Sequence, residues 1–236
     1  MIDAHCHLMD ISKDSINPDF FKLEKIVNSA YCLNSSKNSV QMKKKYSNLV
    51  FSSMGISPQK SMIEISKEIL EISSILDVES KYVDAIGEIG LDYHWGDNEE
   101  KRKFQKQSFI SQIELAKEFQ KPIIIHSRDA INECIDLLSK FEYDVMFHFY
   151  SGNVDEARKI CDNDWFISIP PLKGRKRTEV IEKIEIENIV CETDAPYVGK
   201  TPLDVEKSIE IVSDIKQIDK KEVEKITSKN TLNIFQ

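Results

Sequence analysis

The sequence lacks any long hydrophobic run. Its longest apolar stretches, such as Pro122 to Ile125 and Val145 to Phe147, are far shorter than the roughly 20 residues that a membrane-spanning helix needs. The N-terminus reads Met-Ile-Asp-Ala-His and shows neither the basic start nor the apolar segment of a signal peptide. We therefore expect a cytoplasmic protein with no membrane partner, and nothing in the sequence predicts a stable protein partner.

Paired cysteine spacing is also lacking. The five cysteines form no CxxC pair, and their odd number argues for reduced thiols and against a disulfide framework or a zinc knuckle. Glycine and proline, with seven residues each, fall at segment boundaries and do not cluster. Without repeats, low-complexity tracts or a linker, the chain is predicted to form one domain, residues 1–236.

The sequence has fewer basic than acidic residues. The 40 acidic residues outnumber the 32 basic ones, which gives a formal net charge of −8. An acidic protein is not drawn to polyanions as a whole, so a nucleic-acid substrate would need a local basic surface or bound cations. The charge speaks mildly against tight nucleic-acid binding, but it does not exclude a nuclease whose metal ions carry the positive charge.

Short apolar runs alternate with amphipathic stretches along the chain. Eight of these runs are predicted to be strands: Ile2–His7, Ala30–Leu33, Leu49–Met54, Val83–Gly87, Pro122–His126, Asp144–His148, Trp165–Ile169 and Asn188–Glu192. Helical patterns lie between them, at Ser61–Leu76, Glu99–Phe119, Ala130–Lys140, Val154–Cys161, Val180–Lys183, Leu203–Lys216 and Lys221–Thr227. Eight strands with helical connections predict an α/β fold, a (β/α)8 TIM barrel. An open, doubly wound sheet is an alternative on the pattern alone.

Histidines and acids gather where these strands end. Residues two apart in a strand point to the same face, so the two histidines of the first strand can reach one ion. In a parallel barrel the carboxyl ends of the strands converge on one rim, where active sites form. Six polar residues stand at, or just beyond, the ends of five strands: His5, His7, Glu88, His126, His148 and Asp194.

This set is larger than one structural ion needs. Four imidazoles and two carboxylates suit two adjacent divalent ions with open coordination positions. Such ions lower the pKa of a shared water towards about 7 and so provide a nucleophile for hydrolysis. A lone histidine at a strand end is more often an ordinary hydrogen-bonded residue, but six such groups are costly to bury without partners. The fifth histidine, His94, is interpreted as a surface residue or a substrate contact.

Six segments in a fixed order carry a family resemblance: IDAHCHL (residues 2–8), GEIGLDY (87–93), PIIIHSRDA (122–130), HFYSG (148–152), ETDAPY (192–197) and NTLNIF (230–235). Together they resemble the TatD family of metal-dependent hydrolases, often described as TatD-type deoxyribonucleases. The resemblance covers the whole chain and implies an amidohydrolase-like TIM barrel.

Carried over position by position, the resemblance also implies a ligand set. One ion would be held by His5, His7, Glu88 and Asp194, and a second by Glu88, His126 and His148, with Glu88 bridging. Asp194 would also hold or deprotonate the attacking water, so that Asp194 and Glu88 are the implied catalytic residues. Two divalent ions are expected, and Mg, Mn and Zn are all compatible with these ligands.

Three loops depart from the family pattern. Residues 55–59 read Gly-Ile-Ser-Pro-Gln where the family commonly has Gly-Ile-His-Pro-His, so both of those imidazoles are missing. The loop at residues 197–202 is short, and two prolines occupy positions 170 and 171 where a small residue is frequent. None of these differences touches the ligand set, and all three concern the substrate pocket.

Phosphodiester hydrolysis, with DNA as the substrate, is the predicted activity. Arg128 follows His126 by two residues and is expected to grip a phosphate oxygen with its planar guanidinium, unless it orients Asp129 or caps a helix. Lys173 and Arg175 belong to a basic cluster at residues 173–177 that would attract DNA locally, unless the run is only a solvated helix start.

Aromatic side chains near the expected rim could stack on bases, although packing is an equally common role. Tyr93 is the main candidate, and the others are Trp95, Phe149 and Tyr197.

Two other functions stay open. The same metal chemistry hydrolyses other esters or amides, including an aminoacyl ester on RNA. A non-catalytic metal-binding scaffold is the second, although all six ligands are present.

Overall fold

The computed structural model describes residues 1–11 and 16–236. Eight parallel strands form one sheet, and each strand pairs with the next along the chain. They are β1 Ile2–Cys6, β2 Lys25–Asn28, β3 Val50–Met54, β4 Ala85–Asp92, β5 Ile123–Arg128, β6 Val145–Phe147, β7 Phe166–Ile169 and β8 Ile189–Cys191.

The two edges of this sheet come together. The backbone N–H of Asp194 donates to the carbonyl of His5 at 2.9 Å, and the N–H of His7 donates to the carbonyl of Ala195 at 2.8 Å. Cys6 and Ala195 form a parallel bridge. The sheet is therefore a nearly closed barrel, which confirms the predicted TIM barrel. The doubly wound alternative fails, because its strand order is not sequential.

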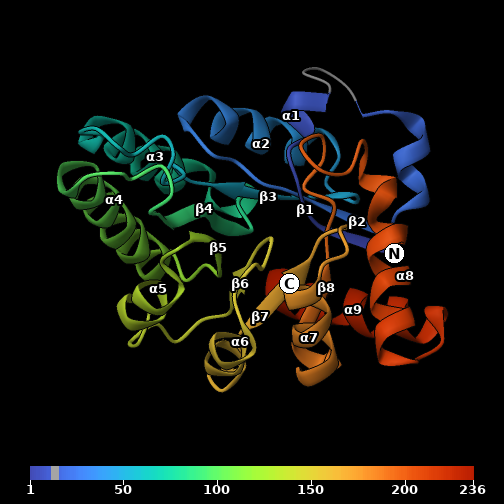
Figure 1. The fold of residues 1–236 in the computed structure, drawn as a ribbon. Helices are drawn as coiled ribbons and strands as arrows, with labels where there is room; N and C mark the ends of the chain where they lie inside the picture. The colour runs from blue at the N-terminus through green and yellow to red at the C-terminus, as the bar shows by residue number, and fades with distance from the viewer. Residues whose placement is uncertain (12–15) are drawn as a thin grey trace.

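Helices surround the barrel, one or more after each strand (Figure 1). They are α1 Leu8–Ile11, α2 Leu33–Lys45, α3 Ser66–Glu79, α4 Glu99–Glu118, α5 Ile131–Leu137, α6 Val154–Cys161, α7 Arg175–Lys183, α8 Val205–Lys216 and α9 Lys220–Phe235. Four short 3-10 helices lie at Pro18–Lys22, Ser80–Tyr82, Ile186–Asn188 and Pro202–Asp204. In the described part of the chain, no helix is both long and apolar enough to span a membrane.

Apolar side chains fill the inside of the barrel. One residue from every strand joins Ile234 and Phe235 of α9 in a separate buried cluster, and these eight are Ala4, Val27, Phe51, Ala85, Ile124, Met146, Phe166 and Val190. Figure 1 shows the C-terminus beside the last strands, which agrees with this packing. The interior is thus a packed core, as in other α/β barrels, and the open space lies at the rim.

The predicted second strand is wrong. The strand is Lys25–Asn28, and the run Ala30–Leu33 forms the connection to α2, a helix that the prediction lacked. Cys32 is the N-cap of α2, where Ser35 accepts a hydrogen bond from its backbone N–H at 2.9 Å. The apolar character of this run favours a strand, but the hydrogen bonds that start helix α2 determine its structure.

Several other predicted strands and helices were too short. β4 continues five residues beyond Gly87 to Asp92, so Glu88 lies inside the strand instead of just beyond it. β5 likewise runs past His126 to Arg128. Helix α7 begins at Arg175 and absorbs most of the basic cluster, and α9 extends to Phe235.

Candidate metal centre

Three side chains meet where β1 and β8 end. His5 lies in β1, His7 directly follows it, and Asp194 stands three residues beyond β8. The Nε2 atoms of the two histidines are 3.4 Å apart, and Oδ1 of Asp194 lies 3.7 Å from that of His5 and 3.3 Å from that of His7. These three residues are close enough to hold one metal ion and are called the first triad below.

A second group of three comes from β4, β5 and the end of β6. Oε2 of Glu88 lies 3.4 Å from Nε2 of His148, and Oε1 lies 3.9 Å from Nδ1 of His126. The facing nitrogens of His126 and His148 are 3.2 Å apart. This second triad is also close enough to hold one ion.

The two triads are neighbours. The rings of His5 and His148 stack with centroids 3.9 Å apart and planes only 5° from parallel. All six residues selected from the sequence therefore lie in one cluster at the mouth of the barrel. The first triad as defined by these distances does not include Glu88, so the bridging role of Glu88 stays a prediction.

Ser29 contacts both histidine rings of the first triad from behind. Nδ1 of His7 lies 2.9 Å from the carbonyl oxygen of Ser29, which can only accept a hydrogen bond. The proton of a neutral His7 ring is therefore on Nδ1, and its Nε2 lone pair faces His5 and Asp194. Nδ1 of His5 contacts the hydroxyl of the same Ser29 at 3.0 Å. A lone pair directed at a carboxylate is the arrangement that a shared cation would satisfy.

Asp92 plays the equivalent part in the second triad. Its Oδ2 accepts a hydrogen bond from Nε2 of His126 at 2.9 Å, which leaves Nδ1 of that ring to face the triad. Gln59 donates from Nε2 to the same Oδ2 at 3.1 Å. Asp92 and Ser29 were not selected from the sequence. Asp92 follows Glu88 by four residues within GEIGLDY, and that spacing is the only signal that pointed to it.

Glu192 stands behind His148. Its Oε2 lies 4.0 Å from Nδ1 of His148, and its Oε1 accepts from the backbone N–H of Phe149 at 2.7 Å. Within residues 1–11 and 16–236, neither Oε2 of Glu192 nor Nδ1 of His148 has a hydrogen-bond partner, although both atoms are buried. His5, His148 and Glu192 also lie close enough together to hold one ion.

Burial sets the charge of the ion-free cluster. Burial, together with the other histidines, lowers the pKa of His5 and His148 well below the usual range, so both rings are neutral. Burial raises the pKa of Glu88. Burial also opposes a charge on His7, but Asp194 and Glu88 outweigh it and raise the pKa of His7 to about 9. Neutral imidazoles are the form that binds divalent ions, and His7 must lose its proton to join them.

Backbone geometry beside the second triad allows only glycine at position 90. Gly90 has φ +137°, and a Cβ at this position would lie 2.1 Å from the carbonyl oxygen of His126. The close approach pairs β4 with β5, where Gly90 is opposite His126. The absence of a side chain at Gly90 therefore positions both His126 and the strand that carries Glu88.

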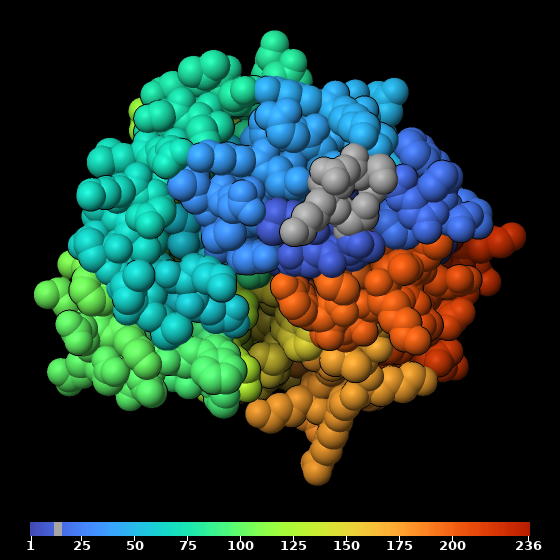
Figure 2. Space-filling view, turned by 90° about the horizontal axis from the view of Figure 1, so that it is seen from above, coloured from blue at the N-terminus to red at the C-terminus, as the bar shows by residue number. Residues whose placement is uncertain are grey.

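Two cavities open onto the triads. A cavity of about 390 Å³ is lined by residues of both triads together with Tyr31, Gln59, Lys60 and Tyr197. A second, of about 410 Å³, shares His126, His148 and Asp194 with the first and extends over Ser127, Arg128, Phe149, Ser151 and Val198. Figure 2 shows a hollow between the segments coloured cyan, yellow and orange. Substrate can therefore reach the triads from solvent.

The predicted substrate contacts are distributed unevenly. Arg128 is exposed at the end of β5 and lines the larger of these two cavities. Tyr93 donates from its hydroxyl to Glu133 at 2.7 Å and lines a separate, neighbouring cavity. Lys173 and Arg175 line neither cavity at the triads, with side chains 74% and 92% exposed.

The other three aromatic candidates differ in whether they line a cavity at the triads. Phe149 and Tyr197 line one cavity each, whereas Trp95 is exposed and packs against His94, with ring centroids 5.0 Å apart. Tyr31, which sequence reasoning missed, lies with its ring centroid 5.4 Å from that of His7. Tyr31 lies in the connection between β2 and α2, a segment that was predicted to be a strand.

Comparison with known sequences extends these observations. The sequence profile of the family described as TatD related DNase matches residues 2–236. A metal-dependent hydrolase of Methanocaldococcus jannaschii is 29% identical, over 99% of this chain and 96% of its own. The human deoxyribonuclease TATDN3 is 27% identical, over 100% of this chain and 94% of its own.

Solved structures share the fold. The TatD homologue YjjV of Escherichia coli superposes with a TM-score of 0.85 at 20% identity, and it covers 100% of this chain and 97% of its own. A TatD family hydrolase of Entamoeba histolytica gives a TM-score of 0.86 at 21% identity, with 100% and 97% coverage. The barrel described above is thus the fold of these proteins.

Proposed function

We propose that this chain, which belongs to the TatD family of metal-dependent hydrolases, hydrolyses phosphodiester bonds of DNA with two divalent ions held at the mouth of its barrel. The observation that carries the proposal is the pair of adjacent triads. Their ring nitrogens face inward because Ser29 and Asp92 occupy the other nitrogens of His7 and His126. Imidazole nitrogens and carboxylates directed at common points are the donor arrangement that bound cations would satisfy.

The donor set fits divalent metal. His5, His7 and Asp194 would hold one ion, and Glu88, His126 and His148 the other, with Mg, Mn and Zn as the candidates. When bound, such ions supply Lewis-acid activation of water and of the phosphate group.

The two carboxylates are suited to different tasks. Asp194 lines both cavities and its side chain is 14% exposed, so it can accept a proton from a water that approaches the phosphorus. Glu88 has a side chain only 5% exposed and lines one of the two cavities. We assign Asp194 the role of general base and Glu88 that of a fixed ligand placed between the triads.

Arg128 provides positive charge beside the triads. It shares its cavity with His126 and Asp194, and its guanidinium can pair with phosphate oxygens in two parallel hydrogen bonds. Tyr93, Lys173 and Arg175 are assigned weaker, outer contacts with DNA, because none of the three lines the cavities at the triads.

Metal-dependent cleavage of DNA by wild-type protein and by single variants tests the proposal. His126→Ala and Asp194→Asn are each expected to remove cleavage, and a chelator should do the same until Mg²⁺, Mn²⁺ or Zn²⁺ is restored. His94→Ala is the matched control, since His94 is an exposed histidine outside both triads. Full activity in His126→Ala, or cleavage that persists in chelator, would contradict the proposal. If the protein hydrolyses aminoacyl or other esters but never cleaves DNA, the substrate is an ester of that class and not DNA.

A further inference from the structure

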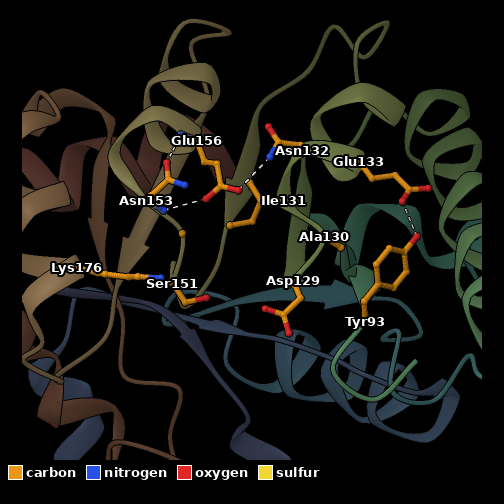
Figure 3. Close-up of a pocket in the computed structure, with 11 residues that line it drawn as sticks. Tyr93, Asp129, Ala130, Ile131, Asn132, Glu133, Ser151, Asn153, Glu156 and Lys176 are labelled. Atoms are coloured by element: carbon orange, nitrogen blue, oxygen red, sulfur yellow. Dashed lines mark hydrogen bonds between the residues drawn. The ribbon is translucent and has the colours of Figure 1, made fainter. Parts of the chain in front are cut away.

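A third cavity lies beside the metal centre. Its volume is about 520 Å³, and Figure 3 shows the residues that line it, from the end of β4 and from the starts of α5, α6 and α7. It shares Ser151 with the cavity that contains Arg128 and reaches His126 and His148. The two spaces therefore adjoin, and a chain that passes over the triads can continue into this third cavity, called the flanking subsite below.

Two of its three acidic groups are already engaged. Glu133 accepts from the hydroxyl of Tyr93 at 2.7 Å and from Lys106 at 2.8 Å. Glu156 accepts from Nδ2 of Asn132 at 3.0 Å and from the backbone N–H of Asn153 at 2.9 Å. These contacts, drawn in part in Figure 3, hold the side chains of Glu133 and Glu156 in the upper wall of the subsite.

Three side chains remain for a ligand. Asp129, Ser151 and Lys176 line the flanking subsite, and none of them has a side-chain hydrogen bond or ion pair with any residue in 1–11 or 16–236. In Figure 3, Lys176 and Asp129 approach from opposite sides, and Ser151 lies between them. The subsite thus offers a cation on one side, an acceptor on the other and a hydroxyl between them.

We propose that the flanking subsite binds the nucleotide next to the scissile phosphate, with its phosphate at Lys176 and the amino group of its base at Asp129. The inference rests on the proposed function and deepens it, because it adds a base preference to the hydrolysis of DNA. Asp129 and Lys176 become specificity-determining residues outside the metal centre.

Charge dictates which part of the nucleotide lies where. A carboxylate repels a phosphate, so the phosphate takes the Lys176 side and a hydrogen-bond donor must face Asp129. Cytosine, adenine and guanine carry exocyclic amino groups that a carboxylate accepts from, as Asp and Glu do with cytosine N4 in DNA recognition. Thymine presents a carbonyl oxygen and a methyl group in place of the amino group. The subsite should therefore disfavour thymine.

The phosphate contact is tested with an uncharged linkage. An oligonucleotide is prepared with one methylphosphonate next to the mapped scissile bond, on either side in turn, and its cleavage and its binding in chelator are measured. On one side the wild-type protein should lose roughly tenfold in binding, whereas Lys176→Ala should bind the charged and uncharged oligonucleotides equally. Lys183→Ala is the matched control, because Lys183 is an exposed lysine of the same helix that does not line the subsite.

The base contact is tested by exchanging one base at the same position. Wild-type protein should prefer cytosine over thymine by about fivefold or more, and Asp129→Asn should reduce that ratio towards one, because an amide both donates and accepts. An equal response of wild type and Lys176→Ala to the methylphosphonate overturns the assignment of the phosphate. A cytosine to thymine ratio that Asp129→Asn leaves unchanged overturns the assignment of the base.

These outcomes are separable from those of the proposed function. If wild-type protein binds oligonucleotides with the expected dependence on Lys176 but never cleaves them, the flanking subsite stands and the hydrolysis of DNA fails. If it cleaves DNA without that dependence, the hydrolysis stands and the subsite fails. If it neither binds nor cleaves, both are wrong.

Discussion

Asp92 holds His126 from behind. Its Oδ2 lies 2.9 Å from Nε2 of the imidazole, while Nδ1 of the same ring faces His148 at 3.2 Å. The carboxylate thus fixes the ring's proton on the outer nitrogen and directs the free lone pair into the second triad. Burial opposes ionisation of Asp92, but the hydrogen bond from His126 outweighs it, so the pKa of Asp92 is lowered.

Asp92→Asn should weaken the second ion without loss of the fold. An amide oxygen still accepts from His126 but carries no charge, and loss of such a partner typically lowers metal affinity 10–100-fold. Calorimetric titration with Zn²⁺ or Mn²⁺ measures the two sites separately. Ser29→Ala is the matched variant for the first triad, since it removes only the hydroxyl contact of His5. Each variant should weaken its own site, and equal effects on both sites would count against two distinct triads.

Gly90→Ala should be severely destabilising. The added methyl would lie 2.1 Å from the carbonyl of His126, at a φ of +137° that an L side chain rarely adopts. We expect a loss of about 2–4 kcal/mol in the free energy of unfolding, or failure to fold. Gly174→Ala is the control, because nothing lies within 4 Å of the corresponding Cβ. Denaturant unfolding measures both, and a change within about 0.5 kcal/mol for Gly90→Ala would contradict the strand geometry.

Binding of the first ion should release a proton. The pKa of His7 is raised from 6.5 to about 9 in the ion-free protein, where burial is outweighed by the carboxylates of Asp194 and Glu88. The charged ring therefore stabilises the ion-free fold fully below pH 6.5, and this contribution is lost as the pH rises through 9. Since the ion requires the neutral ring, its apparent affinity should rise up to about tenfold per pH unit between pH 7 and 9.

Titrations in two buffers with different ionisation enthalpies count the released protons at pH 7.5. Wild-type protein should release about one proton more than His7→Gln, which carries no titratable ring. An affinity that is constant from pH 7 to pH 9 would show that His7 is not a ligand.

Arg128→Ala should reduce the salt dependence of DNA binding. A side chain that neutralises one phosphate contributes about one to the slope of log affinity against log salt, so the slope should fall by about 1. Arg158→Ala serves as the control, because Arg158 is an exposed arginine of α6 that pairs with Asp155 at 3.5 Å. Binding measured between 50 and 200 mM salt, about the range over which phosphate contacts are felt, gives both slopes. Equal slopes for wild type and Arg128→Ala would show that Arg128 makes no contact with a phosphate.

The barrel and the six central residues were predictable from the sequence. Seven of the eight predicted strand runs overlap a strand of the structure, and each triad member stands at or near the end of a run. Strand β2 was missed because only Ile26 and Val27 are apolar in it, whereas the more apolar run after it starts a helix. That error also hid Ser29 and Tyr31, whose contacts with the first triad depend on how β2 pairs with β1.

Side-chain direction was not predictable either. The basic cluster reads as one charged run, but helix α7 separates its members. Lys176 lines the flanking subsite, Arg177 packs over Phe149 with its Cζ 5.6 Å from the ring centroid, and Lys173 pairs with Asp214 at 3.7 Å. Which of these residues meets a substrate depends on the start of a helix, and the sequence pattern placed that start five residues too late.

Anomalous diffraction from crystals grown with Mn²⁺ or Zn²⁺ tests the central claim most directly. We expect two peaks per chain, one enclosed by His5, His7 and Asp194 and the other by Glu88, His126 and His148. The His126→Ala crystal should keep the first peak and lose the second. Crystals saturated with metal that show no peak at either triad, or only one shared by all six residues, would contradict the two-ion site.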